Sequence, residues 1–155
     1  MESIRRSESG WETIFVTCFV ICRGGDAIVM IETPASILCI DDEEPALLLR
    51  RRVLERVGYR VFWALSGREG IERFRYQPTD VVIVDYWMAG MNGLEVAKEI
   101  KVMSSKTPII MLSGFTTILD EGLGKVDLWM RKGDSNPEQL LMAVVHLLDK
   151  RRERG

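Results

Sequence analysis

Acidic residues stand where two apolar runs end. Asp41 and Asp42 directly follow the run "SILCI" (36–40), and Asp85 directly follows "VVIV" (81–84). Carboxylates brought together repel one another unless a cation lies between them. A hard divalent ion bound by a few carboxylates and water describes Mg²⁺ in proteins. If the two runs are neighbouring strands, the sequence predicts a magnesium site formed by Asp41, Asp42 and Asp85.

A hydroxyl and an amine complete the set. Ser113 follows the run "PIIML" (108–112), and Lys132 lies just after "VDLWM" (126–130). A hydroxyl and one cation beside Mg²⁺ form a cradle for a phosphoryl group. A carboxylate such as Asp85 can then act as a nucleophile and form an acyl phosphate, a reaction that depends mainly on positioning and charge neutralisation.

The elements that must position these residues alternate along the chain. Strands are predicted at 36–40, 59–64, 80–84, 108–112 and 126–130. Helices are predicted at 45–57, 66–76, 92–104 and from 136 to the charged tail, with a weak helix between 117 and 124. In the first helix the apolar stripe is expected at Ala46, Leu49, Val53 and Val57. The neighbouring Arg50-Arg51-Arg52 is expected to be a solvated helix face.

The first, third and fourth runs are continuously apolar, which is typical of strands buried on both faces of a parallel sheet. The predicted fold is therefore α/β: a doubly wound, five-stranded parallel sheet of order 2-1-3-4-5, flavodoxin-like in topology. Ligands bind such sheets beyond the carboxyl ends of the strands, where the strand order reverses. In this order the reversal lies between strands one and three, so Asp41, Asp42 and Asp85 are expected to converge.

Composition excludes several classes of protein. The 155 residues carry 21 Lys and Arg against 23 Asp and Glu, a net charge of −2, so neither nucleic acid nor an anionic membrane is an expected partner. The apolar run at 14–22 is shorter than the ~20 residues that span a bilayer. Three cysteines, an odd number, suit a reducing cytoplasm. The single histidine leaves a zinc site short of ligands.

The first 35 residues differ from the rest and are expected to be an extension. Gly24-Gly25 between apolar runs is a β-hairpin signal. A second interpretation takes Met30 as the true start of the protein. The main domain is predicted at 36–149, followed by a charged tail at 150–155.

In these features the chain resembles the receiver domain of two-component response regulators, of the single-domain type. The resemblance covers roughly residues 36–149. It is carried by Asp41-Asp42 after strand one, Asp85 at strand three, Ser113 at strand four and Lys132 after strand five, and by the "MAGMNG" loop (88–93).

The resemblance implies a role for each acid. Asp85 would accept a phosphoryl group from a histidine kinase or a phosphotransfer protein. Asp42, Asp85 and the backbone carbonyl of Trp87 would bind Mg²⁺ directly, and Asp41 would act through a bound water. The chain would catalyse only its own phosphorylation and dephosphorylation, and so would not be an enzyme in the usual sense.

It also implies a signalling response. Ser113 would contact the phosphoryl oxygens and act as a switch together with Trp129, while Lys132 would pair with the phosphate. The output would be contact with an unknown downstream protein. Gly133 departs from the family, which usually has proline after the lysine.

Two other functions compete with this one. A phosphoaspartate phosphatase needs a second Asp two residues after the nucleophile, where this chain has Trp87. A degenerate receiver that binds partners without being phosphorylated is the remaining alternative.

Overall fold

The structure is a computed structural model that describes residues 19–23, 26–30, 34–114, 124–133 and 136–153. The chain divides into two compact units, residues 1–34 and 35–155. In the first unit, β1 (Phe19–Arg23) and β2 (Asp26–Met30) pair antiparallel on either side of Gly24-Gly25, as the hairpin signal predicts.

The second unit is built on a five-stranded sheet of order β4-β3-β5-β6-β7 in which every neighbouring pair is parallel. The strands are β3 (Ser36–Ile40), β4 (Arg60–Ala64), β5 (Val81–Asp85), β6 (Ile109–Ser113) and β7 (Leu128–Arg131). Numbered within this sheet, the order is 2-1-3-4-5, so the predicted α/β fold is confirmed.

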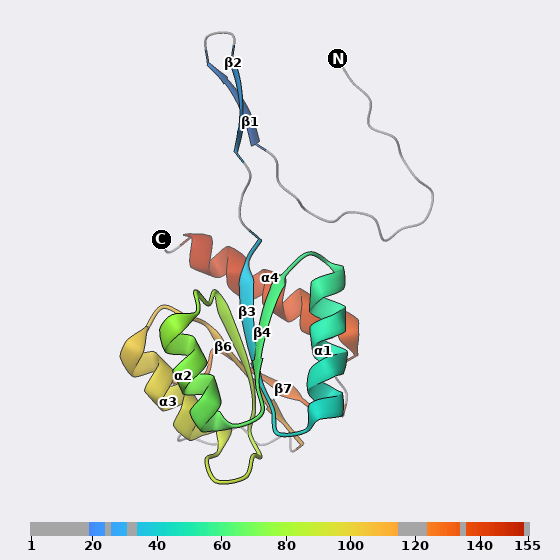
Figure 1. The fold of residues 1–155 in the computed structure, drawn as a ribbon, viewed down its shortest axis with the longest axis vertical. Coiled ribbons are helices and arrows are strands. Elements are labelled where there is room, and N and C mark those ends of the chain that lie inside the picture. The colour runs from blue at the N-terminus through green and yellow to red at the C-terminus, as the bar shows by residue number, and fades with distance from the viewer. Residues whose placement is uncertain (1–18, 24–25, 31–33, 115–123, 134–135, 154–155) are drawn as a thin grey trace. The chain divides into compact units, whose positions relative to one another are not determined.

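Helices cover both faces of the sheet (Figure 1). The helices α1 (Glu44–Arg56) and α4 (Pro137–Glu153) lie on one face, and α2 (Gly67–Tyr76) and α3 (Gly93–Met103) lie on the other. The start of α3 is fixed by a capping box: Asn92 Oδ1 accepts from the Glu95 N–H, and Glu95 Oε2 accepts from the Asn92 N–H.

The core divides at the sheet into two apolar layers. Every residue of β3, β5 and β6 is buried, as their continuous apolar sequences predict, whereas β7 at the edge is half-buried. Cys39 belongs to the layer under α1 and α4, where burial raises the pKa of its thiol to about 12. That cysteine is therefore a small core residue and not a reactive one.

Two predictions about elements were wrong. Strand five begins at Leu128 and not at 126. In α1 the buried residues are Leu47 and Leu54, one position after the half-buried Ala46 and Val53 of the predicted stripe, and Leu49 is 61% exposed, so the stripe was displaced from the buried face of the helix. The weak helix expected at 117–124 lies outside the described residues, apart from Gly124.

Among the described residues, no helix combines the length and the apolar character needed to cross a bilayer.

Candidate functional site

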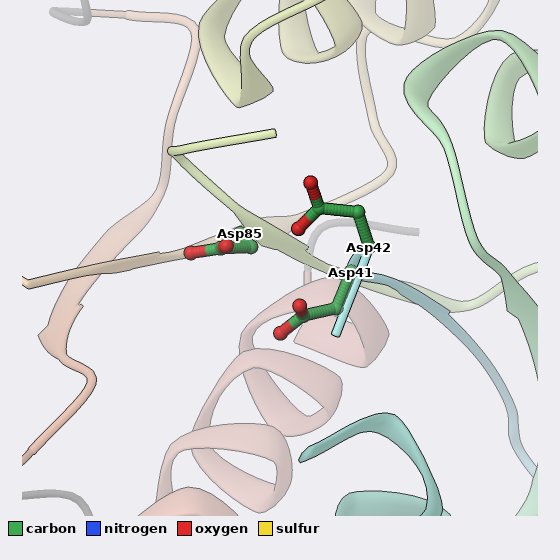
Figure 2. Close-up of side chains that lie close together, drawn as sticks. All are labelled: Asp41, Asp42 and Asp85. Atoms are coloured by element: carbon green, nitrogen blue, oxygen red, sulfur yellow. The ribbon is translucent and has the colours of Figure 1, made fainter. Parts of the chain in front are cut away.

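The acids meet at the carboxyl ends of two adjacent strands. Asp41 follows β3 and Asp85 is the last residue of β5, and the register pairs Ile40 with Val84, so the two acids lie level across the sheet. Carboxylate oxygens of Asp41, Asp42 and Asp85 all lie within 4.8 Å of one another (Figure 2). Asp41 and Asp85 are buried, whereas Asp42 is exposed.

Lys132 reaches this cluster from beyond β7. Its Nζ donates to Asp85 Oδ2 at 3.0 Å and to Glu43 Oε2 at 2.8 Å, and it lies 3.4 Å from Asp41 Oδ2. The backbone is fixed as well, because the Lys132 N–H donates to the Ser113 carbonyl at 2.7 Å. One amine is therefore shared among three carboxylates.

Asp41 is held from two directions. Its Oδ1 accepts from the Glu43 N–H at 2.9 Å, at the start of α1. Its Oδ2 is buried and accepts no aligned hydrogen bond from the described residues, although Arg50 Nη2 lies 2.6 Å away as an ion pair. That oxygen therefore retains lone pairs for a further cation.

Asp42 connects the two loops of the site. Its Oδ2 accepts from the Ala89 N–H at 3.0 Å, so the loop that follows Asp85 is fastened to the end of β3. This loop turns at Gly90, whose φ of 81° lies in the left-handed region that glycine adopts without strain.

The electrostatics of the site are those of crowded acids. Burial raises the pKa of Asp85 above its usual value, and the charge of Asp41 raises it further, while Lys132 opposes both effects. Burial alone would lower the pKa of Lys132, but its hydrogen bonds to Glu43 and Asp85 outweigh that effect and raise it. The lysine therefore stays charged, and the negative charge around it is only partly compensated.

The donor set fits magnesium. A few carboxylate oxygens at an edge open to water match the coordination that Mg²⁺ prefers. Asp41 Oδ2 is buried without an aligned hydrogen bond, and burial and the charge of Asp41 raise the pKa of Asp85, so these carboxylates can accommodate further positive charge.

The other residues predicted for the site, Ser113, Trp87 and Trp129, differ in burial and in their neighbours. Ser113 is buried at the end of β6, next to β5. The side chain of Trp87 is exposed and stands edge-on to Tyr86, with ring centroids 5.0 Å apart. The ring of Trp129 in β7 is half-buried, and its centroid lies 6.1 Å from that of Tyr86.

Two residues of the site were not predicted. Glu43 is the closest carboxylate to Lys132 among those described, and Arg50 pairs with Asp41. The expectation that Arg50 belongs to a solvated face was wrong, since its side chain is only 11% exposed. The spacing Leu47-Arg50-Leu54 places all three on one side of a helix and could have indicated this.

Comparison with known families decides what this arrangement is. The response regulator receiver domain matches residues 37–122. The chain belongs to this family. Receiver domains are signal-transduction modules of two-component systems and not enzymes in the usual sense, and they interact with histidine kinases.

Relatives of this receiver domain occur in several kinds of protein. It is 33% identical over 88 residues to the transcriptional regulatory protein PhoP of Bacillus subtilis, a match that covers 57% of this chain and 37% of PhoP. It is 30% identical over 115 residues to the autoinducer 1 sensor kinase/phosphatase LuxN of Vibrio campbellii, which covers 73% of this chain and 13% of LuxN. The chain thus spans well under half the length of these relatives.

Solved receiver structures superpose on most of the chain. The chemotaxis protein CheY4 of Vibrio cholerae is 32% identical, with a TM-score of 0.70 over 74% of this chain and 99% of CheY4. A CheY-like receiver from Methanospirillum hungatei JF-1 has a TM-score of 0.74 over 79% of this chain and 99% of its own. At 24% identity, the second likeness concerns the fold alone.

Proposed function

We propose that this receiver domain accepts a phosphoryl group on Asp85 from a histidine kinase or a phosphotransfer protein. The observation that carries the proposal is the contact of Lys132 Nζ with Asp85 Oδ2 at 3.0 Å, within a cluster of three aspartates. This geometry presents a carboxylate oxygen beside a positive charge, where an incoming phosphate would also be attracted.

In the reaction, an oxygen of Asp85 attacks the phosphorus and a new O–P bond forms. The bond from phosphorus to the donor nitrogen breaks, and its electron pair leaves with the histidine. Mg²⁺, held by Asp41, Asp42, Asp85 and the Trp87 carbonyl, would supply charge neutralisation for the phosphoryl oxygens.

The other residues of the site position this group. Lys132 can keep its contact with Glu43 while its amine turns from Asp85 to the phosphate, because Glu43 Oε2 lies 2.8 Å away. Ser113, buried at the end of the adjacent strand, would donate its hydroxyl to a phosphoryl oxygen. Trp129 would relay the change to a downstream protein, since its ring centroid lies 6.1 Å from that of Tyr86, the residue that follows Asp85.

Phosphorylation by acetyl phosphate tests this function. We expect the intact mass of the wild-type chain to rise by one phosphoryl group in the presence of Mg²⁺, and that of Asp85→Asn to stay unchanged. Glu99→Gln, which removes an exposed carboxylate on α3, is the matched control and should be phosphorylated like the wild type. An unmodified wild type under these conditions, and with a phosphohistidine donor, would favour the degenerate receiver.

A further inference from the structure

Arg50 is a cation on the buried side of a helix. It lies on the same side of α1 as the buried residues Leu47 and Leu54, one turn from each, and its side chain is 11% exposed. Its neighbours in sequence differ: Arg51 pairs with Glu55 and lies over the Trp63 ring, and Arg52 is exposed. Placing a guanidinium there costs desolvation, which a specific partner has to offset.

That partner is a member of the proposed metal cluster. Arg50 Nη2 lies 2.6 Å from Asp41 Oδ2, and the side chain of Asp41 is fully buried. The contact lacks hydrogen-bond alignment, so it rests on charge attraction. The guanidinium therefore occupies the surroundings of an oxygen that faces the site where a divalent cation would bind.

Arg50 differs from Lys132, the other cation of the site, in the number of acids that it contacts. Lys132 has a second acid at hand, because Glu43 lies outside the aspartate cluster and would hold the amine after a metal arrives. For Arg50, the carboxylate in ion-pair contact among the described residues is Asp41 itself. A divalent cation that enters the cluster must therefore either bind close to the positive guanidinium or displace it from Asp41.

We propose that Arg50 competes with the divalent cation for Asp41 and so weakens metal binding at this site. The inference rests on the proposed function, since it takes the three aspartates as the Mg²⁺ site. A unit charge a few ångströms from the metal lowers the affinity through Coulomb repulsion, and the electroneutral Asp41–Arg50 pair offers the metal less negative charge than a free carboxylate.

The structure also leaves room for the displaced side chain. A cavity of about 250 Å³ lies between α1 and the start of α4, and its lining combines two cations, Arg50 and Lys132, with apolar residues such as Leu49, Val53 and Leu140. The aliphatic part of the arginine can move along these walls while its charged end reaches water at the rim. Metal binding is then coupled to the position of the Arg50 side chain in this cavity.

Calorimetric titration of the full chain with MgCl₂ at constant ionic strength tests the inference. The variant Arg50→Met keeps an unbranched apolar arm and removes the charge, and we expect its Mg²⁺ dissociation constant to fall by about tenfold. Arg50→Gln is a second neutral variant and should shift in the same direction. Arg50→Lys keeps the charge and Arg52→Met removes an exposed one from the same helix, so both should bind like the wild type.

The outcomes separate the inference from the function. Wild-type binding with unchanged or weaker affinity in both neutral variants would overturn the role of Arg50 and leave the magnesium site in place. Equal tightening in Arg52→Met would overturn it too, because the effect would then come from overall charge. If neither the wild type nor any variant binds Mg²⁺, the proposed metal site fails and the inference fails with it.

Discussion

At the scale of single residues, the site is a compromise between folding and chemistry. The two buried aspartates share two cations, since Lys132 pairs with Asp41 and Asp85 while Arg50 pairs with Asp41, and the pKa of Asp85 is raised by burial and by Asp41. A raised pKa means that the folded state disfavours the ionised form of Asp85. Ionised Asp85 therefore lowers the stability of the fold, and a divalent cation bound beside it would reduce that cost.

This conflict predicts that Asp85→Asn is more stable than the wild type at neutral pH in the absence of metal. We expect a difference of about 1 kcal/mol in the free energy of unfolding, a modest figure because Lys132 offsets part of the cost of burying the charge. As the folded pKa lies above the unfolded one, the difference is complete above the folded pKa and disappears as the pH falls below about 4.

Urea unfolding of the wild type and of Asp85→Asn between pH 4 and 8 would measure this difference in the free energy of unfolding. Adding Mg²⁺ should stabilise the wild type more than the variant, because ligand binding to the folded state adds to its stability. A variant that is less stable than the metal-free wild type at pH 7 would contradict this account.

At the scale of elements, Gly93 links the site to α3. A β-carbon at this position would overlap the backbone carbonyl oxygen of Asp85 and press on Met111, and the Gly93 N–H donates to the Tyr86 carbonyl at 2.9 Å. The helix therefore begins directly against the strand end that carries the nucleophile. No other residue allows this close approach without moving one of them.

Accordingly, Gly93→Ala should destabilise the domain by about 1–3 kcal/mol, the usual range for overpacking a tight contact. It should also slow phosphorylation by acetyl phosphate, because Asp85 has to shift. Gly114→Ala is the control for stability, since a β-carbon there meets no atom of the described residues within 4 Å. Thermal unfolding would compare the two, and equal melting temperatures would show that the Gly93 contact relaxes freely.

How far the sequence predicts these elements depends on the strength of each local signal. Some signals are complete within a few neighbouring residues. These are the continuous apolar runs of β3, β5 and β6 and the capping pattern of Asn92 and Glu95, and the structure has these elements as predicted. The buried face of α1 was misjudged because Leu47, Leu48 and Leu49 are equally apolar, so periodicity alone does not select one of them. Its true face includes Arg50, whose burial depends on Asp41 in a different element.

At the scale of the whole molecule, the site exists only because the parallel sheet folds. Asp41, Asp85 and Lys132 are contributed by segments more than 40 residues apart, and the strand order brings their ends to one edge. The convergence of the acids follows from that order and could be predicted. The contact between Lys132 and Glu43 could not be predicted, because the two residues follow different strands and meet only through their side-chain conformations.

The most direct test of this account is the position of a metal in crystals of the full chain grown with Mn²⁺, a divalent substitute for Mg²⁺ with anomalous scattering. We predict an anomalous peak among the carboxylates of Asp41, Asp42 and Asp85, and its loss in Asp85→Asn. A wild-type structure with these side chains in place and Mn²⁺ bound only elsewhere would contradict the central claim that the three acids form a metal-dependent phosphorylation site.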